Sequence, residues 1–151
     1  MTAPDFSYKK DKEIMKLIKI IQKKTQKRSE TVMFDEKEAL RLVLEKYVSL
    51  EQLKDDLNDY DPKLIDYYGK NEVSFSRGNK IDFSSNKENI YKDISARVYQ
   101  TRNSIVHSKE GDKPKYIPYQ HEKQLLHEIS LIKIISEEII IQSSEVLFDS
   151  E

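Results

Sequence analysis

The sequence predicts an all-α fold, a helical bundle of about five to six helices with one small β-hairpin near residues 72–83. Apolar residues recur at spacings of three and four along most of the chain, which is the period of an amphipathic helix. Only three Gly and four Pro occur among 151 residues, so residues that break helices are rare. The length fits a single domain, residues 1–151, with one hydrophobic core.

The first part of the chain is expected to form two helices. The first covers residues 11–28 and has one apolar stripe, made of Ile14, Leu17, Ile18 and Ile21. The second is expected to begin at Asp35, because Glu38 follows three residues later in the pattern of a capping box.

Two short helices and a hairpin are expected next. The helices cover residues 49–57 and 62–68, are separated by "NDYDP" and end at Gly69. In the following segment four apolar residues alternate around Arg77-Gly78-Asn79, which predicts a hairpin; they are Val73, Phe75, Ile81 and Phe83.

The last two predicted helices are longer. One begins after Ser85, whose spacing to Glu88 fits an N-cap. The other covers residues 122–148, and its apolar residues between 131 and 141 occupy more than one face. A helix of this kind lies either at the centre of its bundle or at a subunit interface, and the sequence leaves both open.

Composition excludes some functions. The chain has no cysteine, so disulfides and thiolate metal sites are impossible. The N-terminus lacks the apolar core of a signal peptide and no run reaches 18 apolar residues, so we expect a cytoplasmic protein without a membrane partner. Residues 92–115 contain six Lys or Arg against three acids, which favours a polyanion bound at one place. Residues 1–30 are also basic, but ordinary solvation of a helix surface is the favoured explanation there.

The stretch "VYQTRNSIVHSKEG", residues 98–111, gathers polar residues near a predicted helix end. Helical spacing predicts a core stripe of Ile90, Ile94, Val98, Thr101 and Ile105. It also predicts a polar stripe that faces solvent or a partner, made of Ala96, Gln100, Asn103 and His107. In an ideal helix Arg102 and His107 point about 140° apart. Two copies around a two-fold axis bring them together more easily than one.

The run Arg102-Asn103-Ser104-Ile105-Val106-His107 resembles the signature of the HEPN superfamily, and "YQTRNSIVHSKEG" is similar to bacterial HEPN domains of defence and toxin–antitoxin systems. The resemblance covers residues 85–140. It implies a helical bundle that dimerises with its two motifs facing each other, and often a metal-independent endoribonuclease. We therefore expect a homodimer that cleaves RNA in phage defence or a toxin–antitoxin system, with an antitoxin or sensor protein as a possible further partner.

The residue types suit this chemistry, in which the 2′-hydroxyl of RNA supplies the nucleophile and no cofactor or metal is needed. His107 is the candidate base or acid, Arg102 the phosphate ligand and Asn103 the orienting group. The product then ends in a 2′,3′-cyclic phosphate. A histidine near a helix C-terminus is also a favourable dipole partner, and Arg102 could instead clamp a neighbouring carboxylate.

The loop after the motif supplies candidate RNA ligands, which are Lys109, Lys113, Lys115 and Tyr116. Tyr116 and Tyr119 are suited to stacking on unpaired bases and equally to anchoring the loop on the bundle. A zinc-protease site is disfavoured because His121 and His127 are six residues apart. Two further readings stay open: a non-catalytic module for dimerisation or for RNA or partner binding, and one domain of a longer protein.

Overall fold

A computed structural model describes the backbone of residues 4–106 and 116–149, and the side chains of these residues except 4–11, 24–35 and 148. The described residues form five α-helices, which confirms the all-α class. The chain divides into two compact units, residues 1–36 and 37–151. The first helix, α1 (Pro4–Tyr47), begins in the first unit and ends in the second.

The first unit consists of the N-terminal part of α1. The predicted apolar stripe lies here, and the side chains of residues 12–23 are all exposed. None of the helices in the described ranges combines the length and the apolar character needed to span a membrane.

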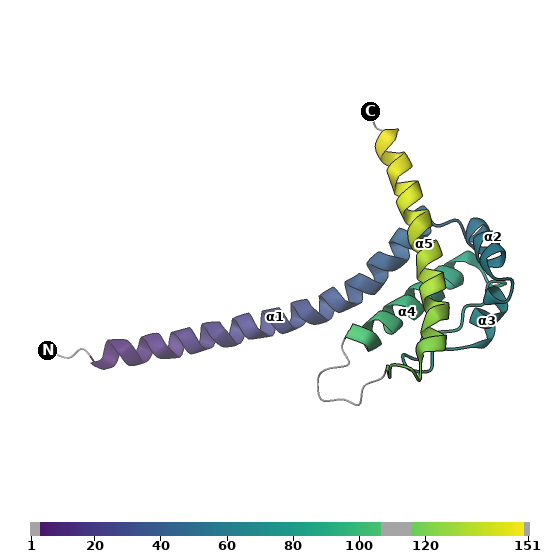
Figure 1. Ribbon diagram of the computed structural model, residues 1–151. Helices are drawn as coiled ribbons and strands as arrows, with labels where there is room; N and C mark the ends of the chain where they lie inside the picture. Colours follow the sequence, from purple (N-terminus) through teal and green to yellow (C-terminus); the bar gives the residue numbers. More distant parts are fainter. Residues whose placement is uncertain (1–3, 107–115, 150–151) are drawn as a thin grey trace. The chain divides into compact units, whose positions relative to one another are not determined.

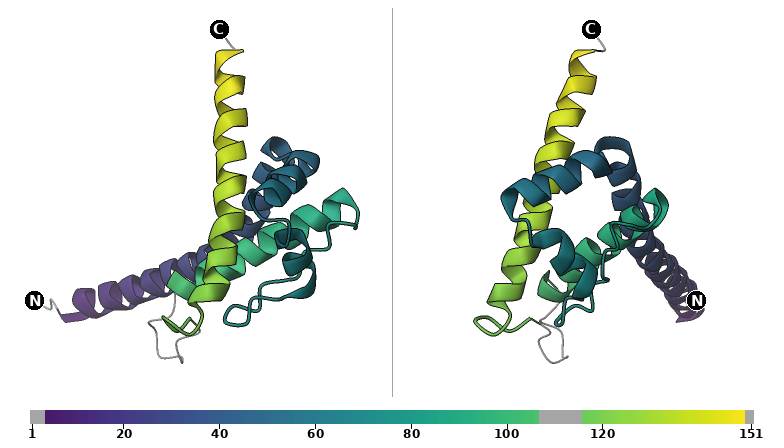
Figure 2. Two further views of the ribbon diagram at one scale, coloured as in Figure 1. Left: turned by 45° about the vertical axis from the view of Figure 1, so that its right-hand side comes forward. Right: turned by 90° about the vertical axis from the view of Figure 1, so that its right-hand side faces the viewer.

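The second unit is a bundle of four further helices with the last turns of α1. They are α2 (Leu50–Tyr60), α3 (Leu64–Lys70), α4 (Lys87–Val106) and α5 (Glu122–Phe148). The two long helices, α4 and α5, cross each other, and α2 contacts both α3 and α5 (Figures 1 and 2). The core contains side chains from all five helices and from the segment between α3 and α4, among them Leu44, Leu53, Tyr68, Ile81, Ile94 and Leu131.

The predicted break between the first two helices does not form. The backbone of α1 is helical without interruption from Pro4 to Tyr47, so Asp35 does not begin a helix. No Gly or Pro occurs between Asp5 and Asp61, and without such a residue the capping-box pattern at Asp35 and Glu38 does not end the preceding helix.

The predicted hairpin is reduced to one antiparallel bridge between Val73 and Gly78. No strand ladder forms in the described part of the chain. The alternating apolar residues, Val73, Phe75, Ile81 and Phe83, are all buried, and the intervening Ser74 and Asp82 are exposed, so the predicted alternation is kept although no ladder forms in this segment. Arg77, within the turn, has a positive φ of 56°.

The predicted starts of α2 and α5 and the division between α2 and α3 are confirmed. Ser49 caps α2 by accepting a hydrogen bond from the backbone N–H of Gln52. At α4 the cap is one residue later than expected: the side chain of Asn86 accepts from the N–H of Asn89 at 2.8 Å. The hydroxyl of Ser85 instead accepts a bond from the side chain of Asn89.

Candidate functional site

A buried ion pair holds the two long helices together where they cross. Arg97 of α4 is 0% exposed, and Glu128 of α5 is also buried. The guanidinium donates from Nε to Glu128 Oε2 at 2.8 Å and from Nη2 to Oε1 at 2.7 Å. This is the parallel, two-bond geometry that makes an arginine–carboxylate pair both strong and directional.

The same guanidinium fixes the segment that follows α3. Its Nη1 donates to the backbone carbonyls of Asn71 and Asn79, each at 2.8 Å. A Cβ at Gly78 would lie only 3.2 Å from Arg97 Cγ and 3.0 Å from Val73 Cγ2, so a larger residue there would require these side chains to shift. Arg97 therefore links α4, α5 and the turn into one rigid support.

The motif residues Arg102 and Asn103 lie near the C-terminal end of α4. Arg102 is exposed and Asn103 is half-buried. Arg102 Nη1 donates to Asn103 Oδ1 at 3.3 Å, so the two polar groups lie side by side. A guanidinium can form paired hydrogen bonds with phosphate oxygens.

An apolar groove of about 260 Å³ lies beside Arg102, between α4 and α5. Its walls are Val98, Thr101, Arg102, Ile105 and Val106 from α4, and Leu125, Glu128, Ile129 and Ile132 from α5. Several of these apolar residues are exposed, including Val106 and Ile129. The groove therefore continues onto an apolar surface with a cation at its rim.

The predicted stripes of α4 are only partly observed. Ile90, Ile94 and Thr101 are buried, but Val98 is half-buried and Ile105 is exposed on the surface near the groove. The polar stripe does not lie wholly at the surface, because Ala96 is 2% exposed and Oε1 of Gln100 is buried without a hydrogen-bond partner in the described part of the chain. The helical period alone did not predict the burial of these positions, because other parts of the bundle cover α4 on more than one side.

The two tyrosines after the motif differ in environment. Tyr116 is half-buried and packs edge-on against Phe75, with ring centroids 5.2 Å apart. His121 lies against the same ring and accepts a hydrogen bond from the N–H of Ile117. Tyr119, in contrast, is 91% exposed and has a positive φ of 67°. These contacts favour the anchoring role for Tyr116 and leave the ring of Tyr119 accessible for stacking.

The other predicted site residues, His107, Lys109, Lys113 and Lys115, lie outside the described residues. Within residues 4–106 and 116–149, no group of three or more His, Asp or Glu side chains is arranged to hold a metal ion.

Neither a protein-family model, nor a curated protein, nor a solved structure matches this chain.

Sequence reasoning missed Arg97. The sequence contains one indication of its role, because Arg97, Thr101 and Ser104 are spaced at four and three residues and so share one helix face. In the structure all three side chains are buried. A polar stripe of this kind on a covered helix indicates buried hydrogen bonds. The partner Glu128 is 31 residues away, which no local pattern identifies.

Proposed function

We propose that the protein is a metal-independent endoribonuclease that acts as a homodimer, with a composite site made of Arg102, Asn103 and His107, in phage defence or a toxin–antitoxin system. The observation that carries the proposal is the exposed Arg102 of the Arg-Asn-x3-His motif at the rim of an apolar groove. A cation for phosphate and an apolar surface for a second copy then lie next to each other.

In this mechanism the RNA 2′-hydroxyl attacks the adjacent phosphorus after His107 removes its proton. The guanidinium of Arg102 stabilises the charge that develops on the phosphate oxygens. Asn103 already contacts Arg102 and orients these polar groups. A second proton transfer to the departing 5′-oxygen leaves a 2′,3′-cyclic phosphate on the upstream fragment.

The groove and the buried ion pair support the dimer. A two-fold contact requires a rigid surface that is complementary to itself. The Arg97–Glu128 pair fixes the spacing of α4 and α5 directly behind the groove, since Glu128 also lines it. Apolar residues at the rim lose contact with water when a second copy covers them.

The alternative function is a non-catalytic module of the same fold that dimerises and binds RNA or a protein partner, such as an antitoxin or sensor. It requires the same groove and the same exposed Arg102. The two functions differ in turnover alone, so a cleavage assay separates them.

The deciding experiment incubates the purified chain with mixed RNA in excess EDTA and identifies the product ends. We expect fragments with 2′,3′-cyclic phosphate termini, because no step of the mechanism uses a metal ion. Cleavage that stops on chelation and returns with Mg²⁺ contradicts the proposed mechanism. An absence of cleavage with intact RNA binding favours the alternative module.

Variants assign the cleavage to this site. His107→Ala is expected to abolish turnover while RNA binding and the dimer mass stay nearly unchanged. His127→Ala is the matched control, since the ring of His127 stacks on the ring of Tyr67, with centroids 3.9 Å apart, and takes part in no proposed step. Arg102→Ala should lose turnover and also weaken RNA binding, because it removes the charge that faces phosphate. Unaltered cleavage by folded His107→Ala would contradict the enzymatic proposal.

A further inference from the structure

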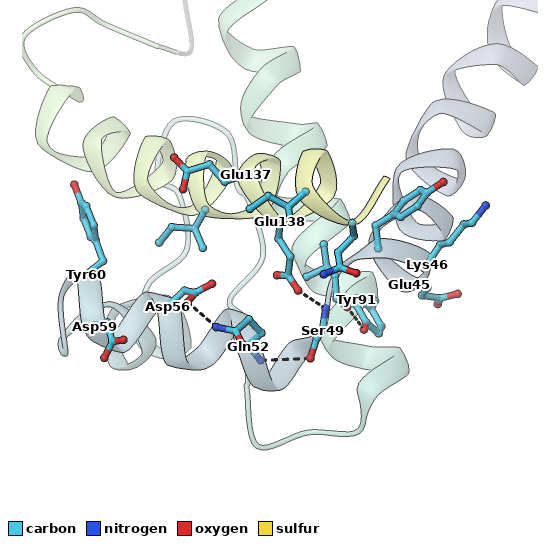
Figure 3. A pocket seen from close by; sticks show the side chains of 15 residues that line it. Glu45, Lys46, Ser49, Gln52, Asp56, Asp59, Tyr60, Tyr91, Glu137 and Glu138 are labelled. Carbon is cyan, nitrogen blue, oxygen red and sulfur yellow. Dashed lines mark hydrogen bonds between the residues drawn. The ribbon is translucent and has the colours of Figure 1, made fainter. Parts of the chain in front are cut away.

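A second, larger cavity lies away from the groove, between α2 and α5 and beside the end of α1. Its volume is about 1050 Å³. Five carboxylates line it, from Glu45, Asp56, Asp59, Glu137 and Glu138 (Figure 3). Lys46 is the one cationic side chain among the lining residues. The cavity is therefore strongly acidic in a chain whose formal net charge is only −1.

The acidic side chains are only partly compensated by neighbouring groups. Glu45 forms an ion pair with Arg41, which lies outside the lining. Asp56 accepts a hydrogen bond from the uncharged side-chain amide of Gln52 at 2.8 Å. Lys46 is directed to the ring of Tyr47, with its Nζ 5.0 Å from the ring centroid. The cavity as a whole thus attracts positive charge.

Glu138 is the unusual member of this group. It is only 8% exposed, and it extends from α5 toward Ser49, the N-cap residue of α2 (Figure 3). Its Oε1 accepts a hydrogen bond from the backbone N–H of Ser49 at 2.7 Å. Its Oε2 is buried and has no hydrogen-bond partner among the described residues.

An unpartnered buried carboxylate oxygen is costly, and most buried polar atoms in proteins have a partner. Burial, and then the negative charge of Asp56, raise the pKa of Glu138, while the hydrogen bond from Ser49 opposes them. On the α4 side the cavity is lined by Tyr91, whose hydroxyl donates its hydrogen bond to the backbone carbonyl of Val48. No described side chain therefore supplies the donor that Glu138 lacks.

The size and lining of the cavity indicate the class of ligand that it suits. A volume of this size is at the upper end of the range for small-molecule sites. The carboxylates are spread along its walls, and in the described part of the chain they form no cluster suited to a metal ion. An extended molecule with several ammonium groups can reach separate carboxylates, since each ammonium has three donors. Three tyrosines also line the cavity, Tyr47, Tyr60 and Tyr91, and aromatic rings accept both methylene chains and cations.

We propose that this cavity binds a linear aliphatic polyamine, with one ammonium group beside the Glu138 carboxylate and others reaching the carboxylates of Asp56 and Asp59. None of these residues belongs to the proposed RNA site, so the two proposals stand independently.

The test uses spermidine as the probe, titrated into the full chain by isothermal calorimetry at neutral pH and moderate salt. We expect saturable binding of one molecule per chain. Glu138→Gln should weaken this binding about tenfold, since it removes the buried charge that the ammonium group contacts. Glu145→Gln is the matched control, because it removes the same charge from α5 outside the cavity, and its affinity should stay within about twofold of the wild type.

A second variant guards against a folding defect in Glu138→Gln. The double variant Asp56→Asn/Asp59→Asn changes residues at or near the surface and should also weaken spermidine about tenfold. Binding that is not saturable in the wild type overturns the proposal. Equal losses in Glu145→Gln and the cavity variants overturn it as well, because they mean that spermidine responds only to overall charge.

Discussion

Arg97 sits in the interior of the bundle with a charge that its surroundings must balance. Its guanidinium makes two hydrogen bonds to Glu128 and two to backbone carbonyls, so the buried charge is paired with a carboxylate and solvated by carbonyl oxygens. Burying such a pair costs desolvation of both ions, and replacing it with apolar residues is often neutral or better. Its value here is geometric, because it sets how α4, α5 and the turn at Gly78 meet.

Removing one partner of the pair should be severe. Arg97→Ala leaves the buried carboxylate of Glu128 and two carbonyls without donors, and we expect the free energy of unfolding in urea to fall by about 3–5 kcal/mol. The free energy of unfolding of Arg97→Lys should lie between those of this variant and the wild type, since an ammonium group cannot form the two parallel bonds.

Two comparisons isolate the pair from general effects of mutating α4. Lys92→Ala, at an exposed cationic position of the same helix, should change the unfolding free energy by no more than about 0.5 kcal/mol. The double variant Arg97→Met/Glu128→Leu should recover much of the loss, because no charge is then left unpaired. A double variant as unstable as Arg97→Ala would contradict this account.

Glu138 makes stability depend on pH in the direction opposite to most carboxylates. Burial raises its pKa in the folded chain above the ordinary value of 4.5, so the folded state holds its proton more tightly than the unfolded state. The free energy of unfolding contributed by Glu138 is therefore greatest below pH 4.5, falls as pH rises to the raised pKa, and stays low above it.

This dependence predicts the behaviour of Glu138→Gln, which cannot titrate. Relative to the wild type, the variant should gain stability as pH rises from 4.5 through the raised pKa of Glu138. Urea unfolding of both proteins across this range measures the difference. Asp56→Asn should reduce the effect, because the charge of Asp56 contributes to the raised pKa. Parallel curves for wild type and Glu138→Gln would show that Glu138 keeps its ordinary pKa.

At the scale of elements, the start of α4 distinguishes two neighbouring cap candidates. The carboxamide of Asn86 accepts from the N–H of Asn89, whereas the hydroxyl of Ser85 accepts from the side chain of Asn89. Asn86→Ala is therefore expected to lower the unfolding free energy by about 1 kcal/mol. Ser85→Ala should change it by less than about 0.5 kcal/mol. The reverse order in urea unfolding would return the cap to Ser85.

Local signals predicted the helices that begin at a cap or follow a proline. Ser49 before α2, Pro62 before α3 and the start of α5 near Glu122 needed only neighbouring residues. The hairpin was not predictable in the same way. Its flanking carbonyls at Asn71 and Asn79 bind Arg97, which is distant in sequence, so a strand pattern became a turn with one bridge.

The candidate site was predictable only in part for the same reason. The sequence indicates Arg102 and Asn103 as neighbours, and their side chains do contact each other. The groove beside them combines residues of α4 with residues about 20 to 35 positions later in α5, and only the crossing of the helices brings them together. Glu138 is similar, because its hydrogen bond to Ser49 spans 89 positions.

At the scale of the whole molecule, α5 presents two exposed apolar regions that a second copy could cover. Ile129 and Ile132 line the groove that Arg102 also lines, whereas Ile140 and Ile141 lie in the C-terminal half of the helix. The wide apolar belt of residues 131–141 thus has a buried part, with Leu131, Ile134 and Ile135 in the core, and an exposed part. The composite site requires the dimer contact to be at the groove, where two copies of the motif can meet.

Ile129→Glu tests which region forms the contact. Ile129 is 48% exposed in the single chain, so a carboxylate there is tolerated by the monomer but is desolvated in a dimer that uses the groove. We expect a monomeric mass by light scattering at micromolar concentration, and loss of RNA cleavage with it. Ile140→Glu, at a position 66% exposed on the same helix, should leave both mass and cleavage unchanged. If Ile140→Glu alone separates the subunits, the contact lies in the C-terminal half of α5. The two Arg102 side chains are then not brought together through the groove, and cleavage would have to come from one chain.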